Sequence, residues 1–194
     1  MLTVGGVTPC TTIDYPDQLA AVVFCRGCPW QCSYCHNRHL LDSDDRETVS
    51  WEEILRFLER RRGLLDAVVF SGGEPTQQDG IDHAIRTVRE MGFLVGLHTA
   101  GPYPGRLRTL LPHLDWVGMD IKAPFHEYER ITGMPGSGEI ARESALLVRE
   151  SGVAHQFRTT LDPFLLQEER IESLRRMVEW EWGSKFLLQQ LSYL

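Results

Sequence analysis

The sequence predicts an α/β fold built from six successive strand–helix units, the last of them open. Two observations lead to this fold class. Apolar runs of strand length recur along the chain, and the segments between them carry apolar residues at helical spacing. Because a strand that is buried on both faces reads as a continuous apolar run, the strands are expected to pair in parallel. Six such units form either a partial (βα)6 barrel or a doubly wound sheet, and periodicity does not separate the two folds.

Each unit follows from the local pattern. The first strand, residues 19–25 (LAAVVFC), leads to a helix over residues 51–62 that Ser50 caps, and Glu52 and Glu53 suit the positive N-terminal end of that helix. Residues 1–18 form a lead-in with no predicted strand. The same alternation predicts strands over residues 67–70, 93–98, 116–121, 153–160 and 185–189, and helices over residues 81–91, 106–111, 139–150 and 167–180.

Composition sets the broad class. The 194 residues, 42% of them hydrophobic and 24% charged, are expected to form a single domain over residues 1–194. The net charge of -7 and the scattered basic residues argue against a nucleic-acid-binding face. No apolar stretch approaches the roughly 20 residues that span a bilayer, and the first residues lack the pattern of a signal peptide. We therefore expect a cytoplasmic protein with no nucleic-acid or membrane partner.

Four of the five cysteines are concentrated where the first predicted strand ends. In a reducing compartment, this density of cysteines indicates metal binding or redox chemistry rather than disulfide bonds. Cys28, Cys32 and Cys35 form a CxxxCxxC loop, which offers three thiolates to a 4Fe–4S cluster that usually has four, so that one iron stays open to a substrate. The alternative is a structural zinc site that adds Cys25 or one of the histidines after the loop. Cys25 is otherwise expected to pack within the strand, and Cys10 has no predicted role.

Further candidate residues lie at the ends of the next predicted strands: Gly72, Gly73 and Glu74 after the second, His98 and Thr99 after the third, Asp120 and Lys122 after the fourth, and Arg158 near the end of the fifth. Both candidate folds bind ligands at this edge, and paired glycines let the backbone approach a ligand closely. Lys122 can pair with a ligand carboxylate, while Asp120 can position it or bind a cation. For Arg158 an ordinary ion pair, and for His98 a structural hydrogen bond, are equally open.

With these motifs the chain resembles the radical S-adenosylmethionine superfamily, whose CxxxCxxC loop has an aromatic residue before the last cysteine, as Tyr34 does here. The resemblance implies a partial barrel and a 4Fe–4S cluster on the three cysteines. The open iron would chelate S-adenosylmethionine, and one electron would cleave it to a 5'-deoxyadenosyl radical. The GGEP segment, Glu74 included, would bind the amino group of this cofactor. His98 and Thr99 would contact its ribose or methionyl portion, and Lys122 its carboxylate.

Within the superfamily, the chain resembles the activating enzymes of glycyl radical proteins, above all those of anaerobic ribonucleoside-triphosphate reductase. The resemblance is carried by residues 11–16, 28–30, 34–37, 71–75, 98–101, 120–124 and 128–133. It implies that the adenosyl radical removes a hydrogen from the alpha carbon of one glycine in a partner enzyme, with an electron donor such as reduced flavodoxin. No cysteines follow position 35, so a single cluster is predicted.

The sequence departs from this family at two places. Asp17 stands where glycine is usual, so the turn there is expected to differ. Residues 187–190 match a family segment that usually continues with Phe-Arg-Pro, but this chain continues differently, which predicts a reduced docking or closing element. Two rival functions stay open: a short radical enzyme acting on a small molecule, such as a 7-carboxy-7-deazaguanine synthase, and a zinc-stabilised binding module without catalysis.

Overall fold

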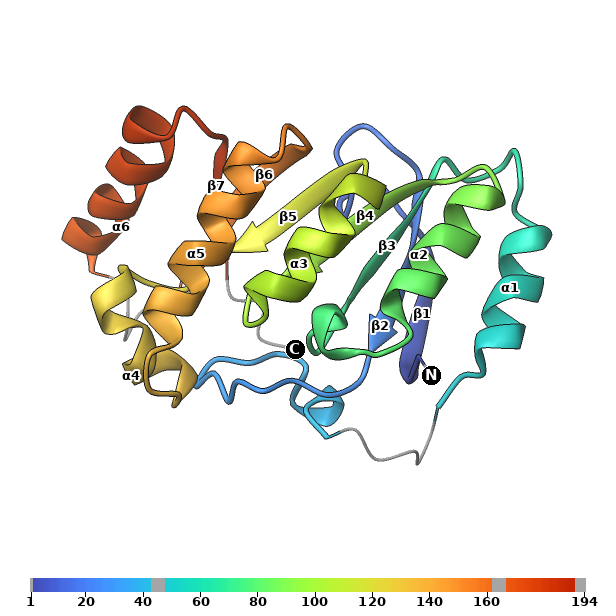
Figure 1. Cartoon of the computed structure of the whole chain (residues 1–194), viewed down its shortest axis with the longest axis horizontal. Coiled ribbons are helices and arrows are strands. Elements are labelled where there is room, and N and C mark those ends of the chain that lie inside the picture. Colours follow the sequence, from blue (N-terminus) through green and yellow to red (C-terminus); the bar gives the residue numbers. More distant parts are fainter. Residues whose placement is uncertain (1, 43–47, 162–166, 191–194) are drawn as a thin grey trace.

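A computed structural model of the chain describes residues 2–42, 48–161 and 167–190 (Figure 1). One seven-stranded sheet runs in the order β1 to β7, and the strands from β2 onward are parallel. A doubly wound sheet reverses its strand order, and this one does not. The sheet is therefore an open barrel, as the motifs favoured. Its parallel strands are β2 (Ala20–Cys25), β3 (Ala67–Gly72), β4 (Leu94–Thr99), β5 (Trp116–Asp120), β6 (Ala154–Leu161) and β7 (Phe186–Gln190).

The lead-in contains a strand that sequence reasoning missed. β1 (Val4–Thr11) pairs antiparallel with β2 and adds a seventh strand at the sheet edge. Its sequence, VGGVTPCT, has two glycines and a proline, residues that are depleted in strands. An edge position tolerates Pro9 because one side of the strand needs no ladder hydrogen bond. The prediction of a strand-free lead-in was therefore wrong.

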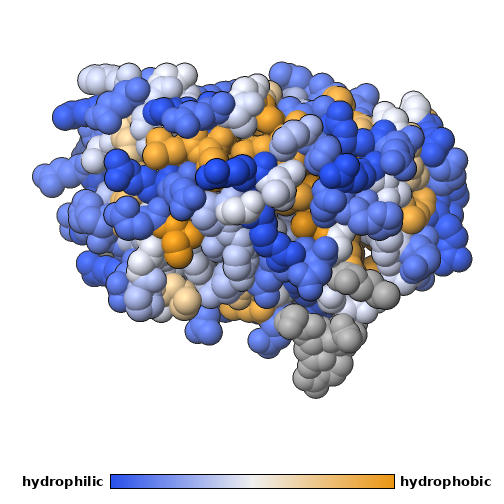
Figure 2. All heavy atoms as spheres, in the orientation of Figure 1, coloured by the Kyte–Doolittle hydropathy of each residue, from blue (hydrophilic) through white to orange (hydrophobic). Residues whose placement is uncertain are grey.

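The predicted helices are all present and cover one face of the sheet (Figure 1). Ser50 forms a capping box with Glu53, as its place before the helix predicted. The predicted last helix continues beyond α6 as a π-helical turn over Arg176–Glu181. The face of the molecule that these helices form is mostly hydrophilic, with several apolar patches (Figure 2). The helices are α1 (Trp51–Glu59), α2 (Ile81–Glu90), α3 (Pro104–Leu110), α5 (Ser137–Glu150) and α6 (Glu168–Arg175).

One further helix, α4 (Tyr128–Thr132), was not predicted. Its five residues are too few for a helical period to be recognised in the sequence. Gly133 ends it in the left-handed conformation, with φ 69°, which glycine adopts without steric cost. Among the described residues, no helix is long and apolar enough to cross a membrane.

The concave face of the sheet is filled at the amino ends of its strands. Tyr15, from the connection between β1 and β2, packs against Trp116 with ring centroids 5.3 Å apart and joins a small apolar cluster there. Asp17 follows with φ 60°, a left-handed conformation that glycine adopts most readily and aspartate tolerates. Because side chains fill the amino end, the carboxyl ends of the strands are left for a binding site. Residues 191–194, where the sequence departs from the family that it resembles, lie outside the described residues.

Candidate functional site

The site is a cavity of about 160 Å³ at the carboxyl ends of the strands. All three loop cysteines line it, together with every other predicted site residue except Glu74. The residues that line it as predicted are Cys28, Cys32, Tyr34, Cys35, Gly72, Gly73, His98, Thr99, Asp120, Lys122 and Arg158. Segments far apart in the sequence thus meet in one place.

Burial keeps two thiols of the cysteine loop protonated, those of Cys28 and Cys32. Burial raises the pKa of Cys28 to about 12 and raises that of Cys32 above its usual range. Metal binding would therefore displace a proton from these thiols. No three His, Cys, Asp or Glu side chains within the described ranges are arranged around a single metal ion. Three cysteine thiols that line one cavity fit a 4Fe–4S cluster, because such clusters are held by cysteine thiolates.

Gly72 and Gly73 are glycines because the cysteine loop lies against them. A Cβ on Gly72 would overlap the backbone of Cys25, and one on Gly73 would overlap the carbonyl of Gly27. Gly72 also has φ 110°, a conformation that side chains rarely adopt. The Gly73 amide donates to the Cys25 carbonyl over 2.8 Å. The end of β3 therefore forms the support on which the cysteine loop is built.

Glu74 points away from the cavity lining and into the protein. Its side chain is 1% exposed and accepts hydrogen bonds from Thr76, Thr99 and the Ala100 amide at 2.6 to 3.0 Å. Burial raises the pKa of Glu74, and these donors oppose that rise. In this structure the carboxylate joins the ends of β3 and β4, whereas the sequence suggested a direct ligand contact. Thr99 both lines the cavity and supports this junction.

Replacing Glu74 with glutamine is expected to destabilise the fold by about 1–3 kcal/mol. The side-chain NH2 group of glutamine cannot accept a hydrogen bond, so at least one of the donors that now bind the Glu74 carboxylate would lose its acceptor. Denaturant unfolding of the two proteins measures this difference. Glu90→Gln is the control, since Glu90 lies exposed on α2. An unfolding free energy equal to that of the control would show that the Glu74 junction contributes nothing to stability.

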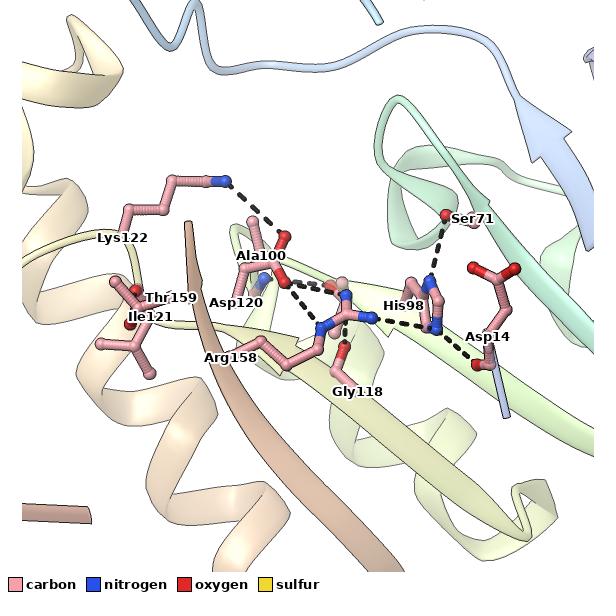
Figure 3. Close-up of polar contacts among 12 residues, drawn as sticks. Asp14, Ser71, His98, Ala100, Gly118, Asp120, Ile121, Lys122, Arg158 and Thr159 are labelled. Atoms are coloured by element: carbon pink, nitrogen blue, oxygen red, sulfur yellow. Dashed lines mark hydrogen bonds and ion pairs between the residues drawn. The ribbon is translucent and has the colours of Figure 1, made fainter. Parts of the chain in front are cut away.

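Arg158 lies between Asp120 and His98, as Figure 3 shows. Its Nε and Nη2 donate to one carboxylate oxygen of Asp120 at 3.0 and 2.8 Å, and the Arg158 residue is only 7% exposed. Burial alone would raise the pKa of Asp120, but Arg158 and Lys122 outweigh it and lower that pKa. Asp120 is therefore ionised, and Arg158 and Lys122 supply the positive charge beside it.

His98 is neutral and held by the protein. Burial and the neighbouring Arg158 lower its pKa to about 3. Its Nε2 lies 2.8 Å from the Asp14 carbonyl, and its Nδ1 lies 3.4 Å from the Ser71 hydroxyl (Figure 3). A neutral ring that donates from Nε2 to Asp14 and accepts at Nδ1 satisfies these two contacts, and Arg158 Nη1, 3.1 Å from the same Nε2, then lies beside the ring without a hydrogen bond to it. His98 thus makes the structural hydrogen bonds that the sequence left open, and its ring also borders the cavity.

Lys122 is the charged group of the site with the weakest attachment to the protein. Its Nζ lies 3.9 Å from Asp120 Oδ2 and 5.7 Å from the Tyr34 ring centroid, and its side chain is 12% exposed. Burial by itself lowers the pKa of Lys122, but acidic neighbours, the ionised Asp120 carboxylate among them, outweigh burial and hold that pKa well above its usual value. A fully charged ammonium group bordering the cavity can pair with an anionic ligand.

Several cavity residues were not predicted as site residues: Trp30, His36, Asn37, Leu41, Ser71, Ala100 and Thr160. Most of them are sequence neighbours of predicted ones, so their place in the loop or at a strand end is the signal that could have found them. Asn37 is informative because its Nδ2 donates to the Gly72 carbonyl over 3.4 Å. This contact closes the cysteine loop onto the end of β3.

Comparison with known proteins shows the family of the chain. The model of the Radical SAM superfamily matches residues 22–180. A provisionally named glycyl-radical enzyme activating enzyme of Methanocaldococcus jannaschii is 34% identical over 91% of this chain and 75% of its own length. The pyruvate formate-lyase-activating enzyme of Clostridium pasteurianum is 30% identical over 86% of this chain and 72% of its own length.

A solved structure is similar in fold. Streptococcus suis SuiB bound to S-adenosylmethionine has a TM-score of 0.66 and 17% sequence identity over 87% of this chain and 39% of SuiB. The chain thus corresponds to well under half of that protein. At this identity the likeness shows the fold, and it agrees with the open barrel described above.

These matches confirm the resemblance inferred from the cysteine loop and the strand ends. Proteins of this family use a 4Fe–4S cluster and S-adenosylmethionine, and the three thiols at the cavity fit the cluster. The chain is therefore an enzyme of this chemistry and not a zinc-stabilised binding module. It belongs to the radical S-adenosylmethionine superfamily and, within it, to the family of glycyl-radical enzyme activating enzymes.

Proposed function

We propose that this chain places a radical on a glycine of a partner enzyme, and that the partner is an anaerobic ribonucleoside-triphosphate reductase. The similarity to a glycyl-radical enzyme activating enzyme over 91% of the chain carries the first part. The second part is supported by the motifs around residues 11–16, 120–124 and 128–133. The open barrel, in which β1 and β7 are both edge strands, suits a substrate that is a loop of another protein.

In this proposal Cys28, Cys32 and Cys35 hold the 4Fe–4S cluster. When bound, the cluster supplies the electron that cleaves S-adenosylmethionine to the adenosyl radical that takes the glycine hydrogen. The protein holds the cysteine loop and the ligand in fixed positions. The Gly73 backbone keeps the cysteine loop in position through its bond to the Cys25 carbonyl.

The strand ends hold S-adenosylmethionine. Lys122 pairs with its carboxylate, because the ammonium group borders the cavity and has only a long contact to Asp120. Asp120 and Arg158 form an ion pair that fixes both side chains at the cavity wall. His98, being neutral, adds no charge beside the ribose or methionyl portion of the ligand.

Replacing Lys122 with alanine is expected to weaken S-adenosylmethionine binding about 10- to 100-fold, because a charge-assisted contact is lost. Iron and sulfide content is expected to stay unchanged, since Lys122 is not a cluster ligand. Titration of the anaerobic, cluster-loaded protein measures the affinity. Lys185→Ala is a matched control because Lys185 is exposed just before β7. Equal affinities of the two variants would remove Lys122 from the binding site.

The partner is tested by electron paramagnetic resonance. The chain is reduced, chemically or by reduced flavodoxin, and incubated with S-adenosylmethionine and a candidate reductase. A doublet from a glycine radical that requires all components supports the proposal. A reductase variant with alanine at the candidate glycine serves as control. Cleavage of S-adenosylmethionine without any doublet would contradict this partner and would favour a small-molecule substrate.

A further inference from the structure

Tyr128 lies at the junction of the cysteine loop and the end of β5, although it does not line the cavity. It is the first residue of α4 and is fully buried, and its ring stacks on Phe125 with centroids 5.6 Å apart. Burial strongly raises the pKa of its hydroxyl, which therefore stays protonated. A buried hydroxyl needs hydrogen-bond partners, and those of Tyr128 belong to the site.

The Tyr128 hydroxyl holds the backbone that carries Lys122. It accepts a hydrogen bond from the Lys122 amide over 2.9 Å and donates a longer one of 3.5 Å to the Asp120 carbonyl. On the other side, the Ile121 amide donates to the Arg158 carbonyl over 2.7 Å. The peptide between Asp120 and Lys122 is thus fixed from two directions, by β6 and by one tyrosine.

The same helix holds the cysteine loop. The amides of Gln31 and Ser33, which flank Cys32, donate to the carbonyls of Thr132 and Ile131 over 3.0 and 3.2 Å. Trp30 lies within the loop and meets the Tyr128 ring edge-on, with centroids 5.9 Å apart. One short helix therefore contacts both the loop that would hold the cluster and the residue that would hold the ligand carboxylate.

We propose that Tyr128 is a positioning residue, which fixes the place of Lys122 relative to the cysteine loop so that both reach one S-adenosylmethionine molecule. The proposal rests on the assignment of Lys122 to the cofactor carboxylate made above. Two anchoring points on a ligand must keep a constant separation if both are to contribute to its binding. Tyr128 supplies that constraint through its hydroxyl, which accepts from the Lys122 amide and donates a longer hydrogen bond to the Asp120 carbonyl.

Tyr128→Phe removes the hydroxyl and keeps the ring. The expected result is S-adenosylmethionine binding about tenfold weaker, with iron and sulfide content unchanged, because the part-buried Lys122 amide loses its acceptor. Tyr15→Phe is the matched control, since Tyr15 is a buried tyrosine at the amino end of the barrel. Binding is measured by titration of the cluster-loaded protein, without any partner enzyme.

A double-mutant cycle separates positioning from a general structural effect. If Tyr128 acts through Lys122, then Tyr128→Phe has little further effect on affinity in the Lys122→Ala background. Equal effects in both backgrounds would overturn the proposal, as would normal affinity of Tyr128→Phe where Lys122→Ala binds weakly. Loss of the cluster from Tyr128→Phe alone would also overturn it, because the hydroxyl would then serve the loop. Normal affinity of Lys122→Ala would instead refute the role of Lys122, on which this inference rests.

Discussion

Replacing Cys32 with alanine is expected to abolish both cluster assembly and S-adenosylmethionine cleavage. Cys32 is the middle ligand of the loop, 9% exposed, and is held by the hydrogen bonds of its neighbours to α4. Two remaining thiolates bind a cubane poorly, and among the described residues Cys28 and Cys35 are the only other cysteines that line the cavity. Iron and sulfide analysis and the yield of 5'-deoxyadenosine measure the two losses.

The cysteines outside the loop provide controls. Cys10 is exposed on β1, and Cys25 is buried in the core without lining the cavity, which confirms that it packs within the strand. Cys10→Ala is therefore expected to retain the full cluster and normal cleavage. Cleavage by Cys32→Ala at the rate of this control would contradict the assignment of the loop cysteines.

Replacing Gly73 with alanine is expected to remove most of the cluster, although Gly73 is not a ligand. A Cβ at this position would overlap the Gly27 carbonyl and approach the Leu40 carbonyl to 3.1 Å. Neither atom belongs to a flexible side chain, so the loop itself must shift. Overpacking of this kind typically costs about 1–3 kcal/mol, and here the displacement falls on the residues just before Cys28.

Gly105→Ala is the control for this substitution. Gly105 lies in α3 with no atom within 4 Å of an added Cβ, and alanine favours a helix over glycine. It is expected to be at least as stable as the unchanged protein and to carry a full cluster. If Gly73→Ala also kept its iron and cleaved S-adenosylmethionine normally, the close contact between the end of β3 and the cysteine loop would not matter for cofactor binding.

The sequence was sufficient where a residue's role depends on its place along a strand. Lys122 and Asp120 could be placed beside the cysteine loop because the carboxyl ends of parallel strands meet at one edge. The strands themselves were recognisable because both of their faces are buried, as the fully buried β2 residues from Ala20 to Val23 show.

The sequence was insufficient where a role depends on which way a side chain turns or on a tertiary partner. Glu74 was expected to meet the ligand, but the structure turns its carboxylate toward Thr76 and Thr99. β1 was missed because an edge strand tolerates glycine and proline, which hide the usual alternation. The contact of Tyr128 with the Lys122 amide has no pattern in the sequence, since it depends on how α4 packs.

The central claim is that the cysteine loop and the strand ends form one site for a 4Fe–4S cluster and S-adenosylmethionine. It is tested most directly by the 5'-deoxyadenosine that the anaerobically purified, reduced protein releases from S-adenosylmethionine, measured together with its metal content. We expect a brown protein with about four irons per chain that forms 5'-deoxyadenosine when reduced. A colourless protein with stoichiometric zinc and no cleavage would contradict the account.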